Sequence, residues 1–288
     1  MSEEKNKVQP STLYLVATPI GNLSDISERA IKVLTECDFV AAEDTRNSLR
    51  LLTALGIKNE LISYHEHNKH QSGERIVARL LTGESCALIT DAGMPAISDP
   101  GEDIVRLCAD AGVTVSVIPG ACAAVSALSL SALSTSRFAF EGFIPVQKSE
   151  RQKRLDALKH EDRTMIFYEA PHKLIATLDA LSETFGADRK IAMCREITKL
   201  NEDVVRCTLG EAVALYKTKE PRGEYVLVVE GISDECKTEE ENELLSLSPE
   251  EHVQRYVDGG MSKKDAIKQA ARDRGIPKSE LYRIVAND

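Results

Sequence analysis

The sequence predicts an α/β protein, with two α/β domains, a ligand cleft and a small C-terminal helical module. Short apolar runs of strand type alternate with helical patterns along most of the 288 residues. This alternation is typical of a largely parallel sheet. Loops rich in glycine, proline and aspartate follow three of the expected strands. Because ligands bind beyond the carboxyl ends of strands in open α/β sheets, these loops are expected to line one cleft.

The first α/β domain is expected over residues 12–145, after a polar segment, residues 1–11, that we expect to be disordered. Asp25 and Glu28 have the spacing of a capping box, so Asp25 is expected to begin the first helix. Later helices are expected to end at glycines, which readily take the left-handed conformation. The expected strands span residues 12–17, 39–42, 61–64, 86–90 and 114–118, and the expected helices end near residues 36, 56, 83, 112 and 131.

The second α/β domain is expected over residues 146–232. The strand and helix pattern breaks around residues 142–145, and the strongly polar stretch that follows indicates a domain boundary. Its expected strands span residues 164–168, 191–194, 204–207 and 225–229, with helices from residue 173 and over 209–216.

The C-terminal part is expected to be an acidic linker, residues 233–248, and a helix-turn-helix-like module, residues 249–288. In the module, Ser262 is placed to begin a helix that Gly275 ends, and Pro277 begins another. Two short helices joined by a tight glycine turn are typical of a helix-turn-helix.

The composition argues against a membrane protein, a secreted protein and a uniformly basic nucleic-acid binder. No apolar run approaches the roughly 18 residues of a membrane span, and the first residues lack the apolar stretch of a signal peptide. We therefore expect a cytoplasmic protein that does not bind membranes. The seven cysteines form no Cys-x-x-Cys pair and are expected to be reduced. The net charge of −10 argues against a uniformly basic nucleic-acid binder, but residues 261–286 are locally basic.

The three loops after the expected strands are residues 18–22, 91–101 and 119–122. None has the glycine pattern of a dinucleotide fold or of a triphosphate loop, which argues against nicotinamide and nucleoside triphosphate ligands. A partly apolar pocket lined by backbone better fits an adenosine-like ligand with one carboxylate and one amine.

Four further clusters follow strands. The histidines at 65, 67 and 70 lack the spacing of a zinc helix, so no metal site is predicted, and this segment is either a polar loop or a substrate contact. The Glu-Asp-Thr-Arg run at 43–46 is either a helix N-cap or a site that puts Arg46 on a phosphate and a carboxylate near a reacting hydroxyl. The runs at 167–172 and 195–199 are either surface ion pairs or parts of the cleft.

Six ordered motifs together resemble the ribosomal RNA small subunit methyltransferase I family, which belongs to the tetrapyrrole methylase superfamily. The motifs are residues 13–26, 42–46, 64–68, 90–101, 166–172 and 195–199. The resemblance implies two α/β domains that enclose S-adenosylmethionine, and 2'-O-methylation of a cytidine in small-subunit (16S) ribosomal RNA, often by a homodimer. The part from residue 249 resembles the family's helix-turn-helix extension.

The resemblance also implies site residues. Those expected to bind the cofactor are Pro19, Asp91, Gly93, Met94, Ile97, Cys122, Ala123, Tyr168, Glu224 and Tyr225. The candidates for the base that takes the hydroxyl proton are, in order, Glu43 or Asp44, His65 or His67, and Glu169, while Arg46, Arg195 and Lys199 are expected to neutralise phosphates. Met94 stands where the family usually has threonine, and Ala170 where it often has serine. Methionine donates no hydrogen bond, so a side-chain contact made by that threonine is not expected at Met94, whereas a contact made by the backbone would be kept.

Two other functions remain open at this point. One is a corrin or porphyrin C-methyltransferase with the same fold, against which the basic C-terminal module and residues 195–199 argue, since a small tetrapyrrole needs no such appendage. The other is a non-catalytic, ligand-sensing protein that binds nucleic acid.

Overall fold

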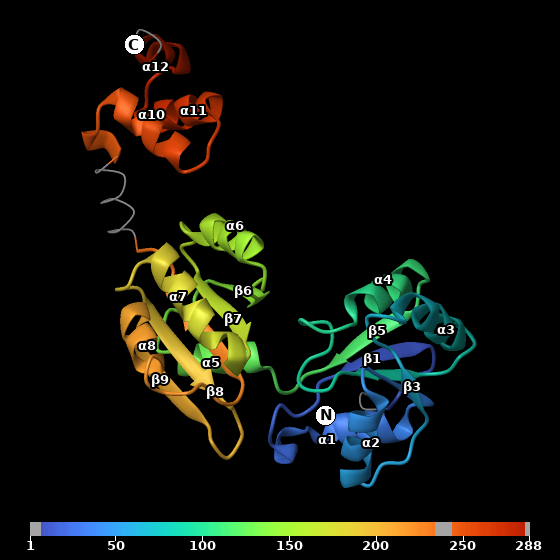
Figure 1. The fold of residues 1–288 in the computed structure, drawn as a ribbon. Coiled ribbons are helices and arrows are strands. Elements are labelled where there is room, and N and C mark those ends of the chain that lie inside the picture. Colours follow the sequence, from blue (N-terminus) through green and yellow to red (C-terminus); the bar gives the residue numbers. More distant parts are fainter. Residues whose placement is uncertain (1–6, 234–243, 286–288) are drawn as a thin grey trace. The chain divides into compact units, whose positions relative to one another are not determined.

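The computed structural model describes residues 7–233 and 244–285 (Figure 1). The chain divides into two compact units. One comprises the residues up to 157 together with 163–230, and the other comprises residues 158–162 and those from 231 onward. Most of the predicted acidic linker and residues 1–6 of the predicted disordered segment lie outside the described residues.

The first sheet is fully parallel, in the order β3-β2-β4-β1-β5. Figure 1 shows helices α1 and α2 on one face of this sheet and α3 and α4 on the other. The parallel alternation predicted from the sequence is therefore confirmed. The elements are β1 (Thr12–Val16), α1 (Glu28–Glu36), β2 (Phe39–Ala42), α2 (Thr45–Ala54), β3 (Leu61–Ser63), α3 (Lys69–Leu81), β4 (Cys86–Ile89), α4 (Glu102–Asp110) and β5 (Thr114–Ile118).

Alternate residues of these strands fill two cores. On β1, Tyr14 and Val16 pack with Leu34 of α1, whereas Leu13 packs on the opposite face with residues of α3 and α4. Both faces of a parallel sheet are covered by helices, which is why the inner strands β2 and β4 are apolar throughout. The loops at the strand ends are thereby held on a rigid base.

The predicted role of Asp25 as the first helix cap is wrong. Asp25 closes a short 3-10 turn, Leu23–Asp25, which Asn22 caps. The N-cap of α1 is Ser27, whose hydroxyl accepts a hydrogen bond from the backbone amide of Ala30 at 3.1 Å. Serine two residues further along offers the same kind of cap, and the extra turn lengthens the loop after β1.

The second sheet is mixed, in the order β6-β7-β10-β8-β9, and only β6 and β7 are parallel. Helix α5 precedes all of its strands and packs on it through Ala124, Ala127 and Leu128. The elements are α5 (Ala123–Leu130), β6 (Phe138–Phe143), α6 (Lys148–Leu158), β7 (Thr164–Glu169), α7 (Leu174–Phe185), β8 (Lys190–Arg195), β9 (Asp203–Thr208), α8 (Leu209–Tyr216) and β10 (Tyr225–Val229).

The chain passes to the second sheet earlier than residue 145. Strand β6 and helix α5 already belong to that sheet, and the polar stretch after residue 146 forms α6 instead of an extended linker. Strand β6 escaped the sequence reading because it contains Glu141 and Gly142, and Gly142 has a φ of +65° beside a register shift. Glycine inside a strand often marks such a bulge.

The C-terminal unit contains α10 (Pro249–Asp258), α11 (Lys263–Asp273) and α12 (Lys278–Val285), packed around Ile267 and Leu281. Ser262 caps α11 as predicted, since its hydroxyl accepts from the amide of Asp265 at 3.2 Å. Gly275, with a φ of +64°, separates α11 from α12. Within residues 7–233 and 244–285, no helix combines the length and the apolar character needed to cross a membrane.

His252 of α10 is expected to make the folding of this unit pH-dependent. Its ring is fully buried, and its Nδ1 accepts a hydrogen bond from Nε of Arg274 at 3.0 Å. Burial, reinforced by the Arg274 charge, lowers the pKa of His252. A histidine held neutral in the fold favours folding above its ordinary pKa of about 6.5 and loses that contribution as the pH falls.

We therefore expect hydrogen-exchange protection of α10 to α12 to decrease as the pH falls from about 7 to about 5, where free histidine becomes charged. Exchange rates corrected for their intrinsic pH dependence provide the measurement. Helix α7 is the control. The histidine beside it, His172, is exposed, so the hydrogen-exchange protection of α7 is expected to stay constant. Equal protection of α10 to α12 at both pH values would show that His252 titrates normally.

Candidate functional site

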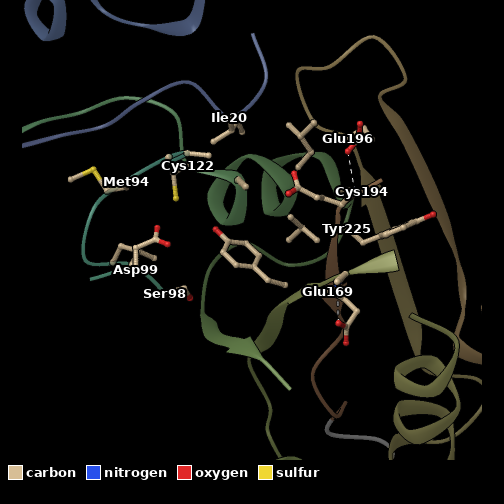
Figure 2. A pocket seen from close by; sticks show the side chains of 18 of the residues that line it. Ile20, Met94, Ser98, Asp99, Cys122, Glu169, Cys194, Glu196 and Tyr225 are labelled. Carbon is tan, nitrogen blue, oxygen red and sulfur yellow. Dashed lines mark hydrogen bonds between the residues drawn. The ribbon is translucent and has the colours of Figure 1, made fainter. Parts of the chain in front are cut away.

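A cavity of about 360 Å³ lies at the carboxyl ends of β4 and β5 and extends to the second sheet. Its size is within the range of about 300 to 1,000 Å³ that is usual for small-molecule sites. Figure 2 shows Met94 and Asp99, from a loop of the first sheet, on one side of it and Cys194 and Tyr225, from strands of the second sheet, on the other. The lining residues are Ile20, Asp91, Ala92, Gly93, Met94, Ile97, Ser98, Asp99, Cys122, Ala123, Phe143, Tyr168, Glu169, Ala170, Cys194, Glu196, Ile197, Lys199, Glu224, Tyr225 and Val226.

The three glycine-containing loops of the first sheet are joined to one another. The amide of Thr18 donates to the carbonyl of Gly93 at 2.9 Å, and the amide of Gly93 donates back at 3.1 Å. The third loop approaches closely at Gly120, where a Cβ would stand 2.8 Å from Cβ of Ala17. Glycine at 120 is therefore required for the loops to meet.

The loop over residues 91–101 is held in an unusual backbone conformation. Ala96 and Ser98 have φ values of +67° and +64°, although neither is glycine. Gly101 has a φ of +156°, and a Cβ there would lie 2.9 Å from both the amide nitrogen and Cβ of Ala96. Residues in sparsely populated conformations cost of order 1–3 kcal/mol each and cluster at functional sites. The conformation of this loop is thus a sign of function.

Tyr168 of β7 forms the cavity wall on the side of the second sheet. Its hydroxyl accepts a hydrogen bond from the amide of Ala124, at the start of α5, at 3.2 Å. Its ring meets Phe140 and Phe143 edge to face, with centroids 5.0 and 5.6 Å away. Burial raises the pKa of Tyr168 to about 12, so the phenol stays protonated at neutral pH.

A second polar group in the wall is built around Lys199. Its Nζ lies 2.9 Å from Oε1 of Glu196 and 2.8 Å from Oε2 of Glu224. Glu196 also accepts from the amide of Glu224, and that bond, followed by the bond to Lys199, lowers the pKa of Glu196. Two carboxylates therefore already surround the lysine charge that the sequence reading assigned to a phosphate.

The structure brings together most residues expected to bind the cofactor. Those that line the cavity are Asp91, Gly93, Met94, Ile97, Cys122, Ala123, Tyr168, Glu224 and Tyr225. Pro19 is not among the lining residues, but its neighbour Ile20 is. The sequence reading missed Asp99 and Glu196, although both stand inside motifs that it had identified.

Of the eight residues expected to be catalytic, two line the cavity and six do not. Glu169 and Lys199 line the cavity, whereas Glu43, Asp44, Arg46, His65, His67 and Arg195 do not. Glu169 is buried, and it accepts hydrogen bonds from the amide of Ala170 at 2.8 Å and from the hydroxyl of Thr177 at 2.5 Å. Both oxygens of its carboxylate are therefore engaged in hydrogen bonds within the fold.

Asp44 and Arg46 form the N-terminal cap of α2. The Asp44 carboxylate accepts from the amide of Arg46 at 2.8 Å and from its guanidinium, which lowers the pKa of Asp44 to about 2. The Arg46 side chain is 87% exposed.

Among the described residues no group of three or more histidine, cysteine, aspartate or glutamate side chains is arranged to hold a metal ion.

Comparisons with known proteins agree with this geometry. Residues 12–213 match the family model "Tetrapyrrole (Corrin/Porphyrin) Methylases". Proteins named ribosomal RNA small subunit methyltransferase I are similar over almost the whole chain. The one from Halalkalibacterium halodurans is 48% identical over 95% of this chain and 94% of its own, and the one from Bacillus subtilis is 48% identical over 94% and 92%. The one from Escherichia coli O157:H7 is 40% identical over 94% and 93%.

Solved structures share the fold at lower identity. Uroporphyrin-III-C-methyltransferase from Thermus thermophilus aligns with a TM-score of 0.54 at 21% identity, covering 76% of this chain and 94% of that one. Diphthine synthase aligns with a TM-score of 0.59 at 15% identity, covering 79% and 93%. These structures confirm the predicted fold class. The chain belongs to the tetrapyrrole methylases and, within them, to the ribosomal RNA small subunit methyltransferase I family.

Proposed function

We propose that this protein transfers a methyl group from S-adenosylmethionine to the ribose 2'-hydroxyl of a cytidine in small-subunit (16S) ribosomal RNA. The observation that carries the proposal is the near full-length similarity, at 48% identity, to proteins named ribosomal RNA small subunit methyltransferase I. The cavity at the strand ends supports it, because the loops that the family motifs identify meet there.

The chemistry of the cavity fits this methyl donor. Ile20, Met94 and Ile97 offer apolar contacts for an adenosine. Asp91 and Asp99 give this part of the wall a negative potential that favours a cationic ligand. When bound, S-adenosylmethionine supplies an electrophilic methyl group on a positively charged sulfur.

The chain's own residues must hold the hydroxyl in line with that methyl group, exclude water and accept the hydroxyl proton. Positioning alone can remove several kcal/mol of the barrier. Among the expected phosphate contacts, Arg46 is the most exposed, with its guanidinium bound to Asp44, whereas Lys199 is paired with both Glu196 and Glu224. Of the expected bases Glu43, Asp44, His65, His67 and Glu169, only Glu169 lines the cavity, and its carboxylate is engaged by Ala170 and Thr177.

A direct experiment separates this proposal from its rivals. Calorimetry with S-adenosylmethionine tests donor binding, and transfer of a tritiated methyl group to small ribosomal subunits tests the reaction. Binding together with labelled RNA supports the proposal. Binding without transfer to any RNA favours a ligand-sensing protein, and label on a tetrapyrrole instead of RNA favours the corrin or porphyrin C-methyltransferase.

We further propose that the C-terminal unit holds the ribosomal RNA. Lys264, Lys268 and Arg272 are exposed at four-residue intervals on α11, so they form a stripe opposite its buried alanines. Cations in a row attract a phosphate backbone without reading its sequence. Arg274 does not belong to this stripe, because its guanidinium is bound to His252 and to carbonyls before α10.

Replacing Lys264, Lys268 and Arg272 by glutamine is expected to weaken RNA binding. Each lost phosphate contact lowers the slope of log affinity against log salt by nearly one, so the slope falls by about 2 to 3. Filter binding at several salt concentrations measures it. A control variant with Lys58, Lys190 and Lys217 replaced removes the same charge from exposed positions elsewhere. An unchanged slope in the α11 variant contradicts the assignment.

Residence in the cytoplasm, which the composition led us to expect, and assembly into a homodimer, which the resemblance implies, complete the proposal. Light scattering of the purified protein tests the dimer, which requires twice the 31.6 kDa mass of one chain.

A further inference from the structure

Five carboxylates line the cavity, and four of them are engaged within the fold. Asp91 accepts from the side-chain amide of Asn47 at 2.9 Å. Glu169 accepts hydrogen bonds from the amide of Ala170 and the hydroxyl of Thr177. Glu196 and Glu224 both accept hydrogen bonds from Nζ of Lys199. In the part of the chain that the structure describes, no hydrogen bond or ion pair involves the carboxylate of the fifth, Asp99. Its lone pairs are therefore available to a ligand.

Asp99 is also held in a fixed place. It is half-buried and follows Ser98, one of the two non-glycine residues with a positive φ in the loop. Gly101, two residues later, permits the close approach of Ala96 that closes the loop. Figure 2 shows the Asp99 carboxylate on the cavity side of this loop. The strained conformation thus presents one unpaired carboxylate to the ligand space.

We propose that Asp99 is the general base of the reaction, a role that rests on the proposed function. As the bond from the ribose 2'-oxygen to the methyl carbon forms, the bond from that carbon to sulfur breaks, and the sulfur keeps the electron pair. The 2'-hydroxyl proton passes to an Oδ atom of Asp99. The products are the 2'-O-methylated ribose and the neutral thioether, and Asp99 then releases the proton to water.

The surroundings of Asp99 suit a base at neutral pH. Burial, and then the charges of Glu43 and Asp91, raise the pKa of Asp99 to about 6. Glu43 faces it from the end of β2, Asp91 from the start of its own loop, and Tyr168 from β7. A base is most effective when its pKa lies near the working pH, because it is then ionised and still binds a proton well. The bound sulfonium charge favours the ionised form further.

The other carboxylates are less suited. Glu43 does not line the cavity, although burial also raises its pKa. Asp44 is paired with Arg46, which keeps its pKa low and makes it a weak base. We therefore assign to Glu43 a positioning role, in which its charge tunes the proton affinity of Asp99.

Replacement of Asp99 by asparagine tests the assignment. Single-turnover transfer of a tritiated methyl group to small ribosomal subunits is expected to fall by about 100-fold or more, the usual contribution of a general base. Calorimetric affinity for S-adenosylmethionine is expected to change by less than about tenfold, or about 1.4 kcal/mol, because the apolar contacts and the charge of Asp91 remain. Glu102→Gln is the control, because Glu102 is an exposed carboxylate just after the same loop.

The pH profile separates a base from a merely structural residue. The wild-type rate is expected to fall below a pH of about 6 as Asp99 becomes protonated. Glu43→Gln removes a neighbouring negative charge and is expected to move this acidic limb to lower pH. Asp99→Asn is expected to abolish the limb.

Three results would overturn the inference. The first is a wild-type rate in Asp99→Asn, and the second is an acidic limb that survives in that variant. The third is loss of the limb in Glu43→Gln, which would make Glu43 the base. If the wild-type protein binds S-adenosylmethionine but labels no RNA, the proposed function fails, and the role of Asp99 falls with it.

Discussion

Replacing Tyr168 by alanine is expected to lower the free energy of unfolding by about 3 kcal/mol, within the range measured for removal of large aromatic side chains. The ring packs between Phe140 and Phe143 and forms part of the cavity wall. Its loss leaves a void beside the ligand, so affinity for S-adenosylmethionine is expected to fall at least tenfold. Urea denaturation and calorimetry measure the two effects.

Tyr168→Phe is the matched control for this prediction. It keeps the ring and removes only the hydroxyl, which accepts from the Ala124 amide. The cost of one such hydrogen bond is about 1 kcal/mol, and donor affinity is expected to change little. Equal effects of the two variants would show that the hydroxyl, and not the ring, supports the cavity.

Replacing Gly101 by alanine is expected to disable the enzyme while leaving it folded. The added Cβ would meet the backbone nitrogen and Cβ of Ala96 at 2.9 Å, at a φ that side chains rarely adopt. The loop must move to relieve the contact, and with it move Gly93, Met94 and Asp99. A displacement of about 1 Å in a catalytic group can slow a reaction by about 100-fold, and a loss of that size in methyl transfer is expected.

The control for Gly101 is Gly259→Ala, which lies between α10 and α11 and outside the stripe of exposed cations on α11 that is proposed to contact RNA. Gly259 has a φ of −74°, and its Cβ would make ordinary contacts at 3.4 and 3.5 Å. Methyl transfer by this variant is expected to match that of the wild type. Full activity in Gly101→Ala would mean that the loop conformation has no role in catalysis.

The sequence was a good guide to elements whose pattern is local. The nine predicted strands exist, because each is a short apolar run followed by a polar loop. The predicted cap at Ser262 exists because capping depends on residues three apart. Strand β6 was not predicted, because it lies at the edge of its sheet, where Glu141 and Gly142 are tolerated and interrupt the apolar pattern. Helix α5 packs on the second sheet through contacts across some 40 to 100 residues, such as those with Ile166 and Val228, which no local pattern encodes.

The candidate site was predicted at the level of its loops, but not of its ionisable groups. Loop motifs led to the residues around Gly93, Cys122 and Tyr168, because glycine and proline mark places where backbone must approach a ligand. Which carboxylates are engaged depends on partners far along the chain. Asn47 donates a hydrogen bond to Asp91, which lies 44 residues away in the sequence, and Lys199 donates one to Glu224, which lies 25 residues away. Asp99 could be distinguished only after those pairings were seen.

One measurement tests the central claim most directly. Small ribosomal subunits from cells lacking this protein are incubated with the purified chain and S-adenosylmethionine carrying a tritiated methyl group, and the labelled nucleoside is identified by mass spectrometry after digestion. The account predicts a single labelled species, a cytidine methylated on its ribose 2'-oxygen. Label on a base, or a protein that neither binds the donor nor labels the RNA, would contradict it.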